Sequence, residues 1–299
     1  MATEILLALI RANLCASAAI FVVMLLRTPA RRLFGPRNAY ALWLAVPAAM
    51  LGSVFAASTA TDSDGTPLMT APSAGPWLDS HDHAVGVLAV WLFGVVAALG
   101  MVAWSQHRFM AAARAGRAGP AVTGIVHARL IAPSDFAQRF TPEERRLVRA
   151  HERVHIDRLD VRANAWAVLV QCLGWFNPFL HLAAHAMRLD QELACDAAVI
   201  ARLPRERRRY AETLLKSHLD RRPLPLGCHW RARGVHPLEA RIAMLAQPAP
   251  SGAWQDIGAA VLTAIAIAAL GLAWALQPPQ PPWLALVITA PIDLLFALH

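Results

Sequence analysis

The sequence VGVLAVWLFGVVAALGMVAW, residues Val85–Trp104, carries no charged side chain. A helix needs about 20 consecutive apolar residues to cross the hydrocarbon core of a bilayer, and this stretch has that length. Three further stretches are long and apolar enough for the same interpretation: Ile5–Leu26, Ala39–Ala57 and Ile257–Leu276. The sequence therefore predicts a mainly α-helical, polytopic membrane protein with four transmembrane helices.

The overall composition agrees with this interpretation. Hydrophobic residues make up 57% of the 299-residue chain and charged residues 16%. Soluble globular proteins have about 25% charged residues, so the composition favours a protein that lies in lipid. The net charge of +8 would fit nucleic-acid binding in a soluble protein. Here the arginines gather in particular loops, which is typical of membrane topology, so the bilayer is the expected partner and no direct nucleic-acid contact is expected.

The charges of the loops predict which parts of the chain lie in the cytoplasm. The loop after the first predicted span contains four arginines and no acidic residue, whereas residues 58–83 contain four aspartates and no lysine or arginine. Residues 105–253 are again rich in arginine. Because positively charged loops stay on the cytoplasmic side, we expect both termini outside and residues 105–253 inside.

These features divide the chain into four predicted parts. Residues 1–104 hold three membrane helices, at about 5–26, 39–57 and 85–104, with an outer loop at 58–83. A cytoplasmic domain covers residues 105–253, the fourth membrane helix residues 254–276, and a short outer tail residues 277–299. The apolar part of this tail, Trp283–Leu298, is interrupted by a proline and an aspartate, so we interpret it as an interfacial segment.

A metal-site motif, HERVH at His151–His155, lies in the predicted cytoplasmic domain. Thr141–Glu144 has the pattern of a capping box that starts a helix, so His151 and His155 are predicted on one helix face. Two imidazoles at this spacing suit Zn²⁺, and Glu152 is a candidate general base. Three protein ligands leave one position for a water whose pKa the metal lowers. Glu152 would take its proton and pass it to the leaving amine of a peptide.

A second predicted helix carries the sequence Gln191–Asp196, in which Glu192 and Asp196 are four residues apart and share a face. Glu192 is the candidate third metal ligand. Asp196 is predicted to accept a hydrogen bond from Nδ1 of a zinc-bound histidine, a contact that sets the tautomer and the ring orientation.

Together these motifs resemble the membrane metallopeptidase family of the BlaR/MecR antirepressors, which are bacterial β-lactam sensor-transducers. The resemblance covers roughly Ile5–Leu276 and rests on Ala39–Trp43, His151–His155, Asp160, Trp175–Pro178 and Glu192–Asp196. It implies a gluzincin-type zinc protease domain between the third and fourth membrane helices, with His151, His155 and Glu192 as ligands and Glu152 as the catalytic residue. It further implies a protein of the bacterial inner membrane that cleaves a cytoplasmic regulatory protein, such as a transcriptional repressor, in signal transduction.

The sequence departs from the β-lactam sensors after the fourth predicted span. Those proteins carry a large penicillin-binding domain there, whereas residues 277–299 contain no Ser-x-x-Lys motif. We therefore expect a short relative that answers another signal, as a homo-oligomer or with a separate sensor protein. Two other functions stay open: a membrane quality-control protease resembling the Ste24/HtpX group, and a non-catalytic signalling protein with a structural metal site.

Two remaining features have plainer interpretations. Ala165–Phe176 is apolar, but a crossing there would put Glu192 on the opposite side from His151, so we predict a buried or surface-lying helix. His181 and His185 are also four residues apart, but no glutamate follows the first histidine. They are interpreted as packed or hydrogen-bonded histidines rather than a second metal site.

Overall fold

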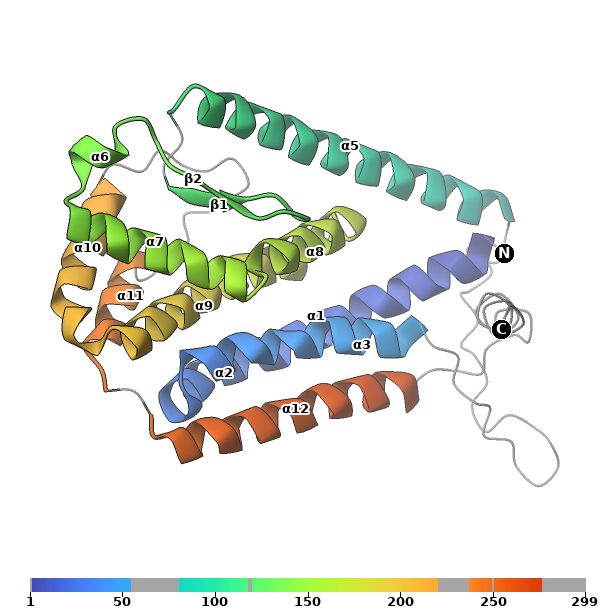
Figure 1. Cartoon of the computed structure of the whole chain (residues 1–299). Coiled ribbons are helices and arrows are strands. Elements are labelled where there is room, and N and C mark those ends of the chain that lie inside the picture. The colour runs from blue at the N-terminus through green and yellow to red at the C-terminus, as the bar shows by residue number, and fades with distance from the viewer. Residues whose placement is uncertain (1, 55–80, 118–119, 220–236, 249, 276–299) are drawn as a thin grey trace, which may run out of the picture. The chain divides into compact units, whose positions relative to one another are not determined.

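The computed structural model describes residues 2–54, 81–117, 120–219, 237–248 and 250–275 (Figure 1). This part of the chain is mainly helical, as predicted. It forms two compact units. The first contains Met1–Val23, Trp43–Leu92 and Leu262–His299, and the second contains Met24–Leu42 and Phe93–Val261.

Three long helices contribute residues to both units: α1 (Ala2–Phe34), α5 (His81–Arg114) and α12 (Gly252–Ala275). Each has the length and the apolar composition needed to cross a membrane, over Ile5–Phe34, His83–Arg114 and Gly252–Ala275. Large apolar side chains on these helices are exposed; Phe93, for example, is 76% exposed. Such surfaces are typical of helices that face lipid, so the chain is a membrane protein.

These helices extend beyond the apolar runs that predicted them. The first continues eight residues past Leu26 and ends in the basic turn that contains Arg31 and Arg32. The third begins at His81, so the last residues of the predicted loop 58–83 are helical, while residues 58–80 lie outside the described part of the chain. The predicted tail at 277–299 also lies outside it.

The second predicted span, Ala39–Ala57, is folded as three short helices, α2 (Pro36–Ala41), η1 (Leu42–Leu44) and α3 (Ala45–Val54). The 3₁₀ turn has a local cause, because Pro47 cannot donate a hydrogen bond to the carbonyl of Trp43 and its ring crowds that carbonyl. Among the described residues only α1, α5 and α12 meet the criteria for a span, so a fourth crossing here stays a prediction.

Small residues allow close helix packing around α12. A Cβ atom at Gly52 of α3 would lie 2.3 Å from the carbonyl oxygen of Leu270. One at Gly258 would lie 2.6 Å from Nδ2 of Asn38, which itself donates a hydrogen bond to the Gln255 carbonyl at 2.7 Å. Contacts of this kind are typical of helices that associate in membranes.

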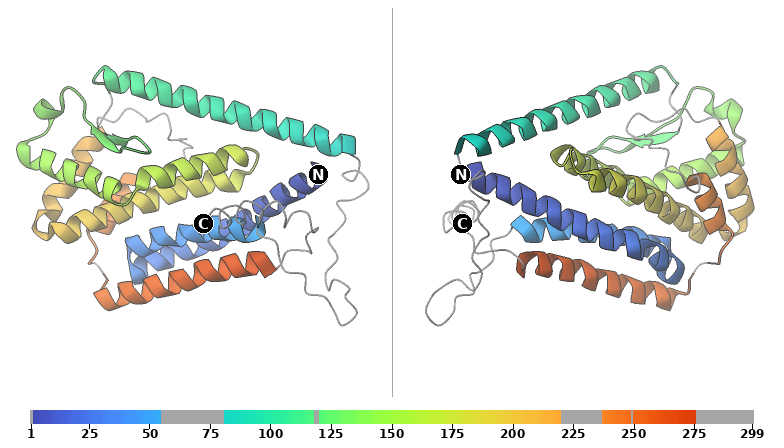
Figure 2. Two further views of the ribbon diagram at one scale, coloured as in Figure 1. Left: turned by 45° about the vertical axis from the view of Figure 1, so that its right-hand side comes forward. Right: turned by 180° about the vertical axis from the view of Figure 1, so that it is seen from behind.

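The second unit is built on a packed group of helices, shown from two further sides in Figure 2: α7 (Pro142–Asp157), α8 (Asp160–Leu173), α9 (Pro178–Arg202), η2 (Pro204–Glu206), α10 (Arg207–Leu219) and α11 (Pro237–Leu245). Their buried core contains Leu147, Val154, Cys195, Val199, Ile200, Tyr210, Leu214 and Leu245. A short helix, α6 (Phe136–Arg139), precedes α7. The antiparallel strands β1 (Ala121–Thr123) and β2 (Arg129–Ile131) pair with Ala121 opposite Ile131 and contact α7.

Helices α1 and α2 hold α9 through partly buried polar contacts. Arg27 donates two hydrogen bonds to Asp190, at 2.8 and 3.1 Å, and Asp190 is fully buried. The hydroxyl of Tyr40 accepts a hydrogen bond from Gln191 at 2.9 Å. Because Asp190 and Gln191 directly precede Glu192, these contacts hold the part of α9 that carries this candidate ligand.

Candidate metal centre

Helix α7 presents the HERVH motif as the sequence predicts. Thr141 and Glu144 form the expected capping box: the Thr141 hydroxyl accepts from the Glu144 amide at 3.3 Å, and the Glu144 carboxylate accepts from the Thr141 amide at 2.9 Å. The helix then continues without a break to Asp157. His151 and His155 therefore lie on the same face, with their ring centroids 4.8 Å apart.

The two imidazoles face each other through their Nε2 atoms, which are 3.1 Å apart. Two nitrogen ligands at about 2.0–2.1 Å from one tetrahedral zinc ion stand roughly 3.3 Å apart. The observed separation is therefore close to the one that a shared metal ion requires.

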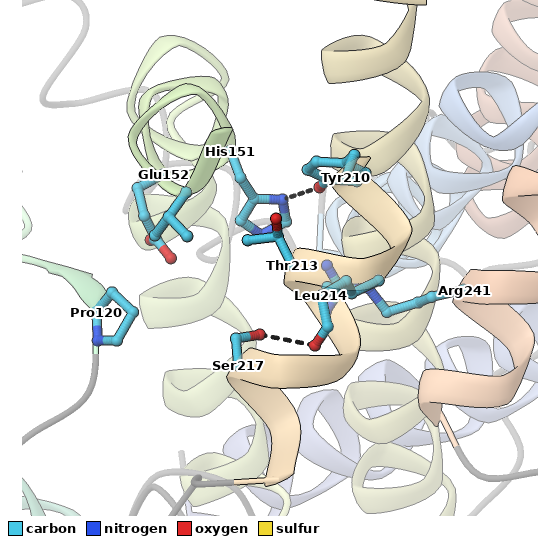
Figure 3. A pocket seen from close by; sticks show the side chains of 9 residues that line it. Pro120, His151, Glu152, Tyr210, Thr213, Leu214, Ser217 and Arg241 are labelled. Carbon is cyan, nitrogen blue, oxygen red and sulfur yellow. Dashed lines mark hydrogen bonds between the residues drawn. The ribbon is translucent and has the colours of Figure 1, made fainter. Parts of the chain in front are cut away.

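The hydrogen bonds of the opposite ring nitrogens select one tautomer for each histidine. The Tyr210 hydroxyl donates to Asp196 at 2.6 Å and must therefore accept from Nδ1 of His151, which lies 2.7 Å away (Figure 3). Nδ1 of His155 lies 2.7 Å from a carboxylate oxygen of Asp160, which can only accept. Both protons thus reside on Nδ1 when the rings are neutral, and both Nε2 lone pairs point into the shared space.

Glu192 completes this group from α9. Its two carboxylate oxygens lie 3.5 Å from Nε2 of His151 and 3.6 Å from Nε2 of His155. Oε2 also forms an ion pair with Nη1 of Arg241 at 2.8 Å, but it is buried and has no aligned hydrogen-bond donor. Two imidazole lone pairs and a carboxylate beside them are a donor set that suits a zinc ion.

The surrounding charges favour a cation at this place. Burial alone would lower the pKa of His155, but its hydrogen bond to Asp160 and its neighbours Cys195 and Glu192 raise it to about 10. Burial also opposes the shift of His151, whose pKa is raised by Tyr210, Cys195 and Asp196. The same acidic groups that stabilise protonated imidazoles would also stabilise a bound metal ion, which must displace those protons.

Cys195 offers another donor to the same site. Its sulfur and one nitrogen each of His151 and His155 lie within 4.8 Å of one another. However, Cys195 Sγ approaches His151 at Nδ1, at 3.5 Å, and donates to the His151 carbonyl at 3.3 Å. A metal bound there would have to replace Tyr210 as the partner of Nδ1. The geometry therefore favours the Glu192 carboxylate over the thiol as the third donor.

Glu152 lies beside this group and is only 5% exposed. Its carboxylate points into a small pocket bounded by His151 on α7, Thr213 and Ser217 on α10, and Pro120 (Figure 3). The pocket has a volume of about 20 Å³. That is enough room for about one water molecule.

The structure brings together the predicted residues His151, His155, Glu192 and Asp196, but the last of these has a different environment from the one expected. The Asp196 carboxylate is 3.4 Å from Nδ1 of His151, and the Tyr210 hydroxyl is the hydrogen-bonded partner of both groups. Arg241 binds the same carboxylate through two hydrogen bonds of 2.7 Å.

Sequence reasoning missed Tyr210 and Arg241, and it assigned no role to Asp160. Tyr210 is one of only two tyrosines in the chain, and both contact residues around the metal-site helices. The rarity of tyrosine in the sequence is a weak signal, because it does not indicate which residue the side chain contacts. His181 meets its prediction, because it forms hydrogen bonds with Gln171 at 3.2 Å and with the Trp175 carbonyl at 3.0 Å.

Comparison with known proteins supports the resemblance seen in the sequence motifs. The curated relatives include the regulatory protein BlaR1 of Bacillus licheniformis, 30% identical over 98 residues, and the methicillin resistance mecR1 protein of Staphylococcus aureus, 32% identical over 98 residues. Each match covers 32% of this chain but only 16% and 17% of the respective relative. No solved structure matches the chain. The sequence pattern of the BlaR1 peptidase M56 family matches residues 7–119 and 112–245, which together make up most of the chain, so this protein belongs to the BlaR1 peptidase M56 family.

Proposed function

We propose that this protein is a zinc endopeptidase of the bacterial inner membrane that cleaves a cytoplasmic regulatory protein in signal transduction. His151, His155 and Glu192 are the proposed zinc ligands, and Glu152 is the proposed general base. The proposal includes four membrane crossings, both termini outside, and the peptidase domain at residues 105–253 in the cytoplasm.

One observation carries the metal assignment: the Nε2 atoms of His151 and His155 lie 3.1 Å apart while Tyr210 and Asp160 hold the opposite nitrogens. The lone pairs of two neutral imidazoles repel each other at this distance, and either a proton or a metal ion between the two nitrogens offsets that repulsion; a metal ion must displace such a proton. The Glu192 carboxylate, within 3.6 Å of both rings, supplies the third donor that such a cation needs.

The chain's own residues then account for peptide hydrolysis. A bound zinc ion would lower the pKa of a water molecule and polarise the peptide carbonyl. Glu152 accepts the proton of the attacking water in the pocket beside His151 and transfers it to the amine that leaves. Tyr210 and Asp160 keep the two imidazoles in the tautomer and orientation that binding requires.

Catalysis is better supported than a purely structural metal site. Structural zinc sites are usually closed by four protein ligands, whereas a His-His-Glu set leaves a position for water. Glu152 would have no function in a closed site, yet it is buried and faces a pocket that can hold a water molecule. A regulatory substrate is proposed from the relatives named as a regulatory protein and a methicillin resistance protein; a quality-control protease would instead cut many membrane proteins.

The test compares wild type with Glu152→Gln and with the control Glu143→Gln, an exposed glutamate on the same helix. Purified wild type should hold about one zinc per chain, and Glu152→Gln should keep the metal but lose activity. Proteomic comparison of cells should reveal one or a few cleaved cytoplasmic proteins with wild type and Glu143→Gln. Identical fragments with Glu152→Gln would contradict the catalytic role, and broad cleavage of membrane proteins would favour quality control.

Zinc content tests the ligand set separately. The double variant His155→Ala, Glu192→Ala removes two of the three proposed donors and should lose the metal. Full zinc occupancy in this variant would place the metal elsewhere.

A further inference from the structure

The α8–α9 hairpin has an apolar tip that is exposed rather than buried. Seven large apolar side chains are at least 36% exposed around the turn: Trp166, Leu169, Leu173, Trp175, Phe176, Phe179 and Leu182. Phe176, in the turn itself, is 52% exposed. Aromatic and aliphatic groups gathered in this way on a cytoplasmic surface would be costly in water, so the tip needs an apolar partner.

The sequence of the hairpin is free of charge over a long stretch. No Asp, Glu, Lys or Arg occurs between Arg162 on α8 and Arg188 on α9. Each of these arginines is 13 residues from Trp175 at the turn, which corresponds to about 20 Å along each helix. Half the hydrocarbon thickness of a bilayer is about 15 Å, so the tip can reach the middle of a membrane while both arginines stay at its surface.

The contact between the hairpin and helix α5 provides an independent estimate of how deep the hairpin tip lies in the bilayer. A Cβ atom added at Gly94 would lie 2.2 Å from the ring of Trp175, so the indole packs directly on the backbone of this membrane helix. Gly94 is near the midpoint of the charge-free stretch 84–106 of α5. From Gly94 to Arg108 is 14 residues, or about 21 Å, which matches the distance from the hairpin tip to its flanking arginines.

Polar groups near the turn are paired within the hairpin, as a lipid environment demands. Gln171 of α8 and His181 of α9 are hydrogen-bonded at 3.2 Å, and the other ring nitrogen of His181 bonds to the Trp175 carbonyl at 3.0 Å. The Asn177 side chain accepts from the Phe179 amide at 3.0 Å. The turn amides of Gly174 and Asn177 donate to Val170 and Gly174 carbonyls.

We propose that the α8–α9 hairpin is a re-entrant element that inserts into the acyl-chain region of the bilayer beside α5 and returns to the same side. The apolar run Ala165–Phe176 enters the membrane without crossing it, because α9 leads the chain back out. Glu192 lies four residues beyond Arg188 and therefore stays on the same side as His151. This apolar run is exposed, as the surface-lying alternative requires and the buried one does not, and the proposed hairpin goes further because its tip enters the acyl-chain region.

Spin-label accessibility in liposomes tests this insertion on the full chain. A single label is introduced by Phe176→Cys or by Leu182→Cys in a background without other cysteines, and collisions with oxygen and with a water-soluble nickel complex are measured. Phe93→Cys on α5, a 76% exposed position, is the lipid-facing reference. Arg208→Cys on α10, where the native side chain is 93% exposed, is the water-facing reference.

The label at residue 176 should match the one at 93, with high oxygen and several-fold lower nickel accessibility than at 208. The label at 182, six residues and about 9 Å closer to the arginines, should be shallower. Nickel accessibility equal to that at 208 at both positions would overturn the proposal. Protection from both oxygen and nickel would also overturn it, because protein, such as a second copy, would then cover the tip. If Phe176→Cys does not fold, the label at 182 decides between these outcomes.

Discussion

The hydroxyl of Tyr210 lies 2.7 Å from Nδ1 of His151, although 59 residues separate them in the sequence. The same hydroxyl donates a hydrogen bond to Asp196 at 2.6 Å. The neutral phenol therefore links the imidazole to this negatively charged carboxylate through two hydrogen bonds. Tyr210 is also part of the buried core between α7, α9 and α10. One side chain therefore packs the domain and orients a proposed metal ligand.

Replacing Tyr210 by phenylalanine should separate these two roles. The ring and its packing stay, but Nδ1 of His151 loses the acceptor that holds its proton. We expect zinc affinity or activity to fall by about 10–100-fold, the usual effect of removing such a partner. Competition with a chelator measures the affinity, and an unchanged melting temperature shows that the fold is kept. An unaltered affinity would mean that Asp196, 3.4 Å from the same nitrogen, holds the ring without help.

Asp160 should have a similar role for His155. Its side chain is 2% exposed and its carboxylate lies 2.7 Å from Nδ1. Asp160→Asn keeps an oxygen but removes the charge, so we expect zinc binding to weaken by about 10–100-fold. Asp157→Asn is the matched control, because in the part of the chain that the structure describes this neighbouring aspartate pairs with the exposed Arg153 and Arg202. Equal effects of the two substitutions on chelator competition would refute a specific role for Asp160.

Arg241 should matter chiefly for stability. Its guanidinium is 2% exposed and pairs with two carboxylates, those of Glu192 and Asp196. Arg241→Met leaves the buried Asp196 carboxylate and the buried Oε2 atom of Glu192 without their guanidinium partner, which should cost about 3–5 kcal/mol and lower the melting temperature. Added zinc should restore part of this loss by binding Glu192. Arg202→Met, which removes an exposed arginine paired with Asp157, should cost less than about 1 kcal/mol; a similar melting temperature for both variants would be evidence against the buried network.

The contact between Glu144 and Lys216 predicts a dependence on pH outside the metal centre. Partial burial raises the pKa of the Glu144 carboxyl, but hydrogen bonds from Lys216 at 2.8 Å and from the Thr141 amide outweigh it, so the pKa is lowered from its ordinary value of 4.5. A lowered carboxyl pKa stabilises the folded protein above pH 4.5, and this stabilisation is lost as the pH falls through the folded value.

Glu144→Gln should therefore melt below wild type at pH 7, and the difference should shrink as the pH falls below 4.5. Glu143→Gln, one residue earlier on the helix, is the comparison without the lysine contact; hydrogen bonds also lower the pKa of its carboxyl, so a smaller change of the same sign is expected there. A difference that stays constant down to low pH would show that the ionised carboxylate does not contribute.

The topology is tested by reporter fusions. A fusion at Gly65 should report the periplasm, and fusions at Gly119 or Arg222 should report the cytoplasm, because arginine-rich segments resist translocation. A periplasmic signal at Gly119 would reverse the orientation and remove the basis for a cytoplasmic substrate.

The sequence by itself determined the features that depend on short-range periodicity. Helical geometry places residues four apart on one face, so the common orientation of His151 and His155, and that of Glu192 and Asp196, followed from spacing alone. The capping box at Thr141 predicted where α7 starts, and it does start there. Long apolar runs predicted α1, α5 and α12, since the hydrocarbon thickness sets the length that such a run must have.

Only the tertiary structure decided which residues from distant segments meet at the site. Tyr210 and Arg241 reach His151 and Asp196 across separations of 59 and 45 residues, and no local pattern encodes such pairs. The Asn177-Pro178 pair is a local signal for the end of a helix, but only the folded structure shows that α8 packs against α9 after this turn. The physical reason is the same in each case: hydrogen-bond periodicity within a helix acts over a few residues, whereas the partners of a buried polar group depend on how whole helices pack together.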